Sequence, residues 1–135
     1  MDNGMKKILI VDDNEVHLVI AENILKGKFD VTTAKSGKDA LTLLSKGYMP
    51  NVILLDVLMP EMDGWETFNK IKGISLLKNV PIAFLTSLDG VREKLYASRI
   101  GAADLISKPY EGPELLNRVE KMMEKKAESP AIPSI

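Results

Sequence analysis

The feature that most constrains the fold is a strict alternation of five short apolar runs with segments of helical spacing. The first, third and fourth runs are continuous stretches of large apolar residues, which is typical of strands buried on both faces of a parallel sheet. Parallel neighbours need crossovers, and right-handed crossovers place helices on both faces. We therefore predict an α/β fold with these three runs at the centre of the sheet. The expected strands are Lys6–Val11, Phe29–Ala34, Asn51–Leu55, Val80–Thr86 and Ala102–Ser107.

Five helices are expected between and after these strands. The first follows Asp13, and its spacing predicts a buried face made of Val16, Val19, Ile20 and Ile24. The second helix is expected at 38–46, and the third begins at Asp63, which forms a capping box with Glu66. The fourth is expected at 90–100, with Asp89 as its N-terminal cap and Gly101 after its end. The fifth begins at Pro113.

The length of 135 residues fits one domain. We expect residues 1–5 to form a flexible leader and residues 6–125 to form the folded domain. Residues 126–135 contain two prolines, so we expect a flexible tail or the start of a linker there.

Composition excludes several function classes. The absence of cysteine removes thiolate catalysis and iron–sulfur clusters. A net charge of −1 creates no field that attracts nucleic acid or an anionic membrane, and no apolar run approaches the ~18 residues of a membrane span. We therefore expect a cytoplasmic protein that contacts neither nucleic acid nor membrane directly.

Polar residues follow four of the five predicted strands. Ligands of open α/β sheets bind at the carboxyl ends of the strands, so these residues are candidate site residues. They are Asp12 and Asp13 after the first strand, Asp56 after the third, Thr86 and Ser87 after the fourth, and Lys108 after the fifth.

Three carboxylates at one sheet edge repel each other unless a cation joins them. Oxygen ligands without His or Cys suit Mg²⁺, which completes its shell with waters and phosphate oxygens. One of the three carboxylates can then act as a nucleophile and take a phosphoryl group as an acyl phosphate. Lys108, the Thr86 hydroxyl and the Ser87 backbone N–H would stabilise the charge of the transferring group.

Four segments resemble the receiver domain of two-component response regulators. They are VDDN at 11–14, LLDVLMPEMDGWE at 54–66, FLTS at 84–87 and GAADLISKP at 101–109. The resemblance implies a flavodoxin-like receiver fold with a five-stranded sheet in the order 2-1-3-4-5 and five helices. It also implies a phosphoryl-accepting switch of a two-component or phosphorelay system, with Mg²⁺ as cofactor. A histidine kinase or histidine phosphotransfer domain would donate the phosphoryl group.

The resemblance assigns a role to each matching position. Asp56 resembles the phosphoacceptor, and Asp12 and Asp13 resemble the acidic pair around Mg²⁺. Leu58 resembles the residue that lends a backbone carbonyl to the metal, and Thr86 resembles the switch hydroxyl.

The fifth predicted strand carries both a match and a departure. Lys108 resembles the phosphate partner of the family, in a Lys108–Pro109 bond that is commonly cis there. Leu105 stands where the family usually has Tyr or Phe, so switching would use leucine repacking or loop movement, or would be weak. Leu58 and Leu88 match the two positions that tune autodephosphorylation in the family, and we expect their apolar character to favour a longer-lived phosphoryl state.

Partner surfaces are also implied by the resemblance. Donor recognition is expected on the first helix, around Glu15, Leu18 and Glu22. The phosphorylated state would be read at the face of the fourth helix, fifth strand and fifth helix, where Tyr96 and Arg99 are candidates. The partner that recognises the phosphorylated state would be a downstream protein or an output domain outside these 135 residues.

Other functions are weighed against this interpretation. A receiver-like binding module that cycles weakly or not at all is the alternative, and Leu105 favours it. A phosphatase of the haloacid-dehalogenase type needs a second Asp where this chain has Leu58, and an FMN carrier needs a Gly-rich loop where it has Asp12 and Asp13. We therefore expect no enzyme beyond a receiver that catalyses its own Mg²⁺-dependent phosphorylation and dephosphorylation. His17 is interpreted as a surface or boundary residue.

Overall fold

Five parallel strands form one sheet in the order β2-β1-β3-β4-β5, which confirms the predicted topology. The computed structural model describes residues 4–127. All residues of β3 and β4 are buried, and β1 is buried except at its first residue, as expected for central strands. The strands are β1 Lys7–Val11, β2 Asp30–Ala34, β3 Val52–Leu55, β4 Ile82–Thr86 and β5 Asp104–Ser107.

Strand register brings the candidate site residues to one edge of the sheet. Val11 pairs with Leu55, and Leu55 pairs in turn with Phe84. Thr86 pairs with Ser107. Because the strands run in parallel, the residues that follow β1, β3, β4 and β5 all leave the sheet at its carboxyl edge.

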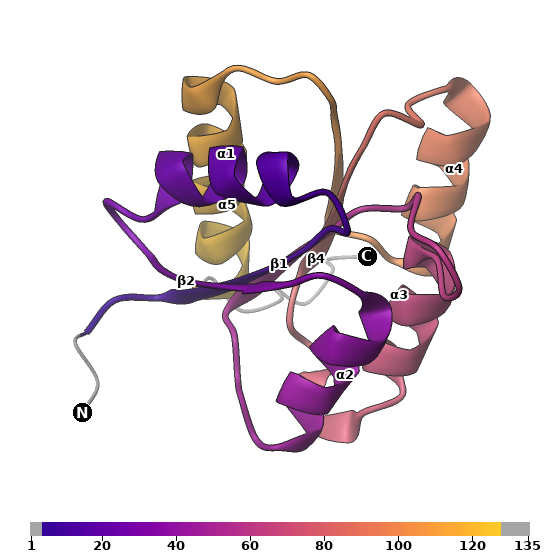
Figure 1. Cartoon of the computed structure of the whole chain (residues 1–135), viewed down its shortest axis with the longest axis horizontal. Helices are drawn as coiled ribbons and strands as arrows, with labels where there is room; N and C mark the ends of the chain where they lie inside the picture. The colour runs from indigo at the N-terminus through magenta and orange to yellow at the C-terminus, as the bar shows by residue number, and fades with distance from the viewer. Residues whose placement is uncertain (1–3, 128–135) are drawn as a thin grey trace, which may run out of the picture.

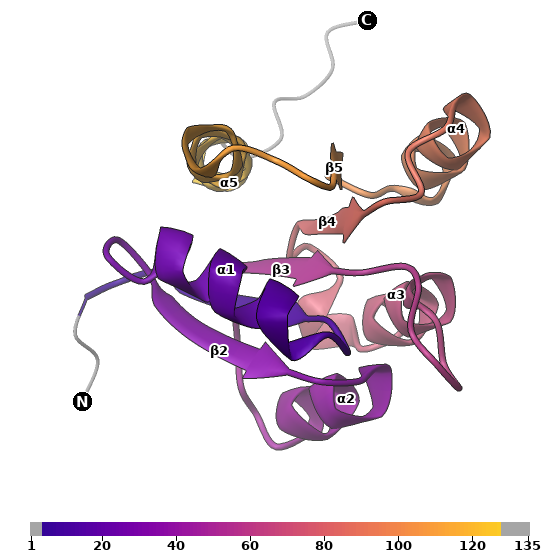
Figure 2. The ribbon, with the colours of Figure 1, turned by 45° about the horizontal axis from the view of Figure 1, so that its top comes forward.

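Helices cover both faces of the sheet (Figure 1). Helices α1 and α5 pack against each other on one face, while α2 and α3 lie next to each other on the opposite side (Figure 2). Helix α4 joins the second face beside β5. The helices are α1 Glu15–Leu25, α2 Gly37–Ser45, α3 Gly64–Lys72, α4 Val91–Ile100 and α5 Gly112–Ala127, with a short 3-10 helix η1 at Ser75–Leu77.

The predicted buried face of α1 is wrong. The helix buries Leu18, Ala21 and Leu25 against the sheet and α5. Val16 and Val19, which were expected inside, are 65% and 53% exposed. Two apolar stripes run along this helix, and helical spacing alone does not decide which one faces the core.

Helix boundaries follow local capping chemistry. Asp63 accepts the Glu66 N–H at 2.9 Å, which confirms the predicted start of α3. Asn14 caps α1 in the same way through His17 N–H. Helix α4 begins after Gly90 without a side-chain cap, so the expected Asp89 cap is wrong, whereas Gly101 has the left-handed φ of 95° expected after this helix.

The ends of the chain were expected to be flexible. Helix α5 continues to Ala127, two residues into the segment expected as a tail. Positions 1–3 of the expected leader and 128–135 of the expected tail lie outside the described residues. Within residues 4–127, no helix is long and apolar enough to cross a membrane.

Candidate functional site

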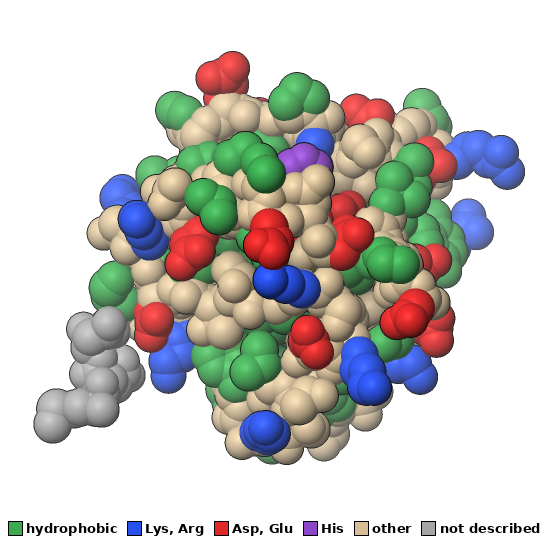
Figure 3. All heavy atoms as spheres, in the orientation of Figure 1, with side chains coloured by type: hydrophobic (Ala, Val, Ile, Leu, Met, Phe, Trp, Pro, Cys, Tyr) green, Lys and Arg blue, Asp and Glu red, His purple; other side chains and the backbone are tan. Residues whose placement is uncertain are grey.

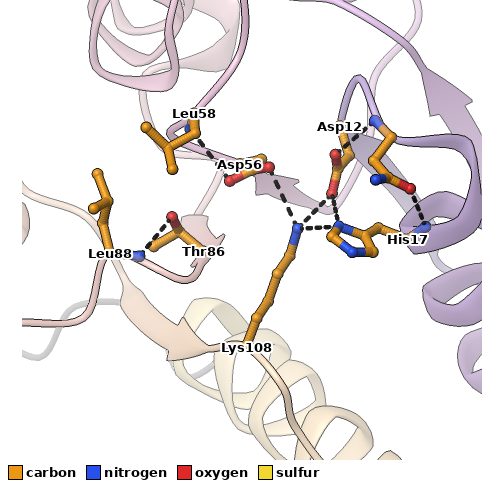
Figure 4. Close-up of polar contacts among 8 residues, drawn as sticks. Asp12, His17, Asp56, Leu58, Thr86, Leu88 and Lys108 are labelled. Carbon is orange, nitrogen blue, oxygen red and sulfur yellow. Dashed lines mark hydrogen bonds and ion pairs between the residues drawn. The ribbon is translucent and has the colours of Figure 1, made fainter.

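The three predicted acidic residues meet at the carboxyl edge of the sheet. Asp12, Asp13 and Asp56 each place a carboxylate oxygen within 4.8 Å of the other two. Lys108 reaches the same place from the end of β5, and Figure 4 shows its ammonium between Asp12 and Asp56. Four of the predicted site residues, from three different strands, are therefore brought together.

Asp12 is held by its position between β1 and α1. Only 3% of the residue is exposed, because β1 is central and the chain turns into α1 directly afterwards. Its Oδ1 accepts the backbone N–H of Asn14 at 2.9 Å. Its Oδ2 accepts from Lys108 Nζ at 2.6 Å, in an ion pair shielded from water.

Asp56 follows β3 and is 7% exposed. Its Oδ1 accepts the Leu58 N–H at 3.3 Å, and its Oδ2 accepts from Lys108 Nζ at 3.3 Å. Burial raises the pKa of this carboxyl above its ordinary value, and Lys108 acts in the opposite direction. The charge of Asp12 raises the pKa further, while the Leu58 N–H lowers it.

Lys108 is fixed at the end of β5 by its backbone. Its N–H donates to the Thr86 carbonyl at 3.0 Å, and the Lys108–Pro109 bond is cis, as the resemblance predicted. The side chain is only 12% exposed. A buried ammonium facing two buried carboxylates makes this lysine the main counter-charge of the site.

Thr86 is the last residue of β4 and Ser87 follows it, next to this cluster. Thr86 is fully buried, and its Oγ1 accepts the Leu88 N–H at 3.1 Å. Figure 4 shows no bond from this hydroxyl to Asp56 among the residues drawn. Ser87 is exposed and lines the cavity above Asp56. The hydroxyl of Thr86 is therefore close to the acidic site and engaged with its own loop.

A cavity of about 550 Å³ opens above the carboxylates. Polar groups lie beside apolar ones around it, and Leu58 at its wall is 53% exposed. Burial, and then the charge of Asp12, raise the pKa of Tyr110 to about 12, so this phenol stays protonated at neutral pH. The cavity is lined by Asp13, Asn14, His17, Ile20, Asp56, Leu58, Ser87, Lys108, Pro109 and Tyr110.

His17 and Tyr110 line this cavity although the sequence did not assign them to the site. The side chain of His17 is 43% exposed, which agrees with its interpretation as a surface or boundary residue. Its Nδ1 nevertheless lies 3.0 Å from Lys108 Nζ. Its Nδ1 is also 3.6 Å from Asp12 Oδ2, so an imidazole nitrogen lies beside oxygen ligands that were expected to stand without His or Cys. Tyr110 follows the Lys108–Pro109 turn and shares the same cavity. The sequence places His17 in the first turn of a helix that follows an acidic loop, but it does not give the direction of the side chain.

The expected partner face is divided between two hollows. Tyr96 and Arg99 line a hollow of about 560 Å³ together with Trp65, whose ring packs edge-on to Tyr96 at 4.9 Å. Leu105 lies in a separate hollow of about 400 Å³ beside Arg118. Leu105 is partly buried and packs against the core, so it helps to anchor β5 to the domain.

The donor set fits a hard divalent cation. The three carboxylates carry three negative charges against the single ammonium of Lys108. Each carboxylate oxygen has two lone pairs, so the oxygens already engaged by Lys108, Asn14 and Leu58 can still coordinate an ion. The acidic cluster could therefore hold a metal.

Comparison with known proteins gives the same result as the geometry. The model of the response regulator receiver domain matches residues 8–120. Protein PilG of Pseudomonas aeruginosa is 35% identical over 115 residues, which are 84% of this chain and 84% of PilG. Response regulator PleD of Caulobacter vibrioides is 34% identical over 117 residues, which are 86% of this chain but only 26% of PleD.

Solved structures agree with this assignment. The chemotaxis protein CheY4 of Vibrio cholerae has a TM-score of 0.83 at 30% identity, with 88% of this chain and 99% of CheY4 covered. The fold, the clustered carboxylates and the match over residues 8–120 point to one family. This chain belongs to the response regulator receiver domains, the phosphoryl-accepting signalling domains of two-component systems.

Proposed function

We propose that Asp56 is the phosphoacceptor of this receiver domain. The observation that carries the proposal is a buried carboxylate whose two oxygens contact Lys108 and the Leu58 N–H beside two further carboxylates. Burial and the charge of Asp12 make the ionised form of Asp56 costly, which favours its reaction as a nucleophile once a cation balances the site.

The reaction transfers one phosphoryl group. An oxygen of Asp56 attacks the phosphorus of a phosphorylated histidine, a new P–O bond forms, and the P–N bond breaks. The electron pair of the broken bond stays on the imidazole nitrogen of the donor, and Asp56 becomes an acyl phosphate. Lys108 donates hydrogen bonds to the phosphoryl oxygens, and the Thr86 hydroxyl and Ser87 N–H contribute further donors.

Mg²⁺ is the proposed cofactor. Asp12, Asp13, Asp56 and the backbone carbonyl of Leu58 would hold it. When bound, Mg²⁺ neutralises charge on the carboxylates and on the transferring phosphoryl group. Lys108 would then be free to act on the phosphoryl oxygens, because it no longer is the only counter-charge for Asp12 and Asp56.

The donor is proposed to be a histidine kinase or a histidine phosphotransfer domain that docks on α1. The exposed stripe of Val16, Val19 and Ile20 lies next to the site cavity, which Ile20 lines. Leu18 is buried, so it cannot contact the donor as expected from the sequence. An apolar surface beside a reactive cavity suits a partner that must bring its own side chain into that cavity.

The downstream partner is proposed to be a protein target or an output domain on another chain or beyond these residues, acting in the cytoplasm. Tyr96 and Arg99 on α4 are exposed, next to Leu95, which is 63% exposed. The protein would catalyse only its own phosphorylation and dephosphorylation. Leu58 and Leu88 would slow the attack of water and lengthen the phosphoryl lifetime.

Intact-mass spectrometry after incubation with acetyl phosphate tests the proposal. A gain of one phosphoryl group that requires Mg²⁺ and disappears in Asp56→Asn is the expected result. Asp104→Asn is the matched control, because Asp104 pairs with Arg118 away from the site. Absence of any gain in folded wild-type protein would favour the second candidate, a receiver-like binding module without phosphorylation cycling, which the leucine at position 105 supports.

A further inference from the structure

His17 contacts the central lysine of the site from the side of α1. Its Nδ1 lies 3.0 Å from Lys108 Nζ and 3.6 Å from Asp12 Oδ2. Figure 4 shows the imidazole and Asp56 on opposite sides of the ammonium. In the space-filling view the imidazole reaches the surface beside hydrophobic side chains (Figure 3). The phosphoryl-transfer mechanism proposed above makes no use of this residue.

The chemistry of the contact fixes which group donates. An ammonium has three donors and no acceptor, so the Nδ1 of His17 must offer its lone pair. A ring that accepts a hydrogen bond at Nδ1 carries its hydrogen on Nε2. The cap bond from His17 N–H to Asn14 Oδ1, at 3.1 Å, holds this turn of α1 against the acidic loop. The position of the ring is therefore set by the helix start.

The three donors of Lys108 are all engaged. The distances from Nζ are 2.6 Å to Asp12, 3.0 Å to His17 and 3.3 Å to Asp56. A phosphoryl group on Asp56 adds oxygens that need these donors. Mg²⁺, when bound, would take over the compensation of Asp12, which leaves His17 as the contact that competes with the phosphoryl oxygens for Lys108. The contact with Asp12 is an ion pair and the shortest of the three, whereas the contact with His17 is longer, so the bond to His17 is the easier one to release.

We propose that His17 is a positioning residue that holds the Lys108 ammonium in the unphosphorylated protein and gives it up when Asp56 is phosphorylated. The inference rests on the proposed function of Asp56. The unphosphorylated form gains a hydrogen bond that the phosphorylated form lacks. His17 therefore acts against phosphorylation, and removal of its acceptor nitrogen favours the phosphorylated state.

Two substitutions separate the hydrogen bond from the bulk of the ring. His17→Leu fills similar space without an acceptor. His17→Asn keeps an acceptor oxygen at the same number of bonds from the backbone as Nδ1. A purely structural role of His17 would make the two variants behave alike, whereas the proposed role separates them.

Beryllium fluoride, a phosphoryl analogue, is titrated at saturating Mg²⁺ into wild type and both variants, with Trp65 fluorescence and calorimetry as readouts. We expect His17→Leu to bind about three- to tenfold more tightly, the range of one net hydrogen bond, and His17→Asn to resemble wild type. Unchanged or weaker binding by His17→Leu overturns the inference. If wild type does not bind beryllium fluoride at all, the proposed function of Asp56 fails first.

Nitrogen-15 NMR of the histidine ring provides a readout independent of affinity. The chain contains a single histidine, so its ring signals need no further assignment. We expect an unprotonated, hydrogen-bonded Nδ1 in the free protein and a change of its shift on addition of Mg²⁺ and beryllium fluoride. A protonated Nδ1 in the free protein, or a shift that does not change, contradicts the proposed release of Lys108.

Discussion

At the scale of single residues, the site depends on the balance between Lys108 and two buried carboxylates. Asp12 and Asp56 are 3% and 7% exposed, and both contact the same ammonium. Removal of one partner from a buried ion cluster leaves the other charges without compensation, which costs far more than loss of a surface pair. Three carboxylates face one ammonium, so the site holds an excess of negative charge that a bound cation would relieve.

Lys108→Met is expected to destabilise the metal-free protein by about 3 kcal/mol, because two buried carboxylates lose their counter-charge. Lys28→Met is the matched control. Lys28 pairs with Glu120 at 3.2 Å on the surface, and its loss is expected to cost less than about 1 kcal/mol. Urea unfolding at neutral pH measures both values. Equal losses of stability in the two variants would show that Lys108 stabilises the fold no more than a lysine in a surface ion pair does.

The raised pKa of Asp56 predicts a dependence of stability on pH. The folded state holds the Asp56 proton more tightly than the unfolded state, because burial disfavours the charged carboxylate and is the largest influence on its pKa. Folding stability therefore falls as pH rises from the ordinary carboxyl range through the raised pKa of Asp56. Asp56→Asn removes this contribution, so its stability falls less over the same range. Urea unfolding across a pH series without Mg²⁺ tests this, and parallel curves for the two proteins would contradict it.

Most of the gathered residues could be predicted because they directly follow strands. Asp12, Asp56 and Lys108 occupy positions that parallel pairing must bring to one edge. His17 could not be placed in this way, since its contact with Lys108 depends on how α1 is rotated about its axis. A single histidine on an amphipathic helix carries no sequence signal for that rotation.

At the scale of elements, the strands were easier to predict than the faces of the helices. Continuous apolar runs in β3 and β4 leave no choice of face, because both sides are covered. Helix α1 has apolar residues on two sides, and the core takes the side with Leu18 and Leu25. Packing against the sheet and α5 selects this side, and that packing is a tertiary effect.

The start of α3 supports the loop that carries Asp56. The Gly64 N–H donates to the Val57 carbonyl at 2.8 Å, and an added Cβ at Gly64 would meet the Asp56 carbonyl oxygen and come within 2.7 Å of Val57 Cα. These are backbone atoms that cannot rotate away. The close approach of α3 to this loop therefore requires glycine at position 64.

Gly64→Ala is expected to destabilise the protein by about 2 kcal/mol, because the clash moves either α3 or the Asp56 loop. Gly27→Ala is the control, since an added Cβ at Gly27 meets nothing within 4 Å. Its effect is expected to stay within about 0.5 kcal/mol. Thermal and urea unfolding measure the stability of both variants. A Gly64→Ala protein as stable as wild type would argue against the tight contact between α3 and the loop.

At the scale of the whole molecule, the two proposed partner surfaces are separate. The cavity and the exposed stripe of α1 lie together, whereas the hollow beside Tyr96 is lined by residues of α4 and by Trp65. The ring of Trp65 contacts both Phe84 of β4 and Tyr96 of α4, at 4.5 Å and 4.9 Å. This aromatic chain connects the strand that ends at Thr86 with the proposed partner face.

Val16→Asp is expected to reduce phosphoryl transfer from a phosphorylated histidine phosphotransfer domain about tenfold or more, since it places a charge in the proposed apolar docking stripe. Phosphorylation by acetyl phosphate should stay unchanged, because the small donor needs no docking surface. Val91→Asp is the control, as Val91 is 73% exposed on α4. Equal transfer to both variants, from a donor that phosphorylates wild type, would remove α1 as the docking element.

The central claim is that Asp56 itself receives the phosphoryl group. The most direct measurement is reduction of the phosphorylated protein with borohydride, which converts an aspartyl phosphate to homoserine, followed by peptide mass spectrometry. We predict homoserine at position 56, dependent on Mg²⁺ and on the phosphoryl donor. Conversion at Asp12 or Asp13 instead, or no conversion in protein that has gained a phosphoryl group, would contradict the account.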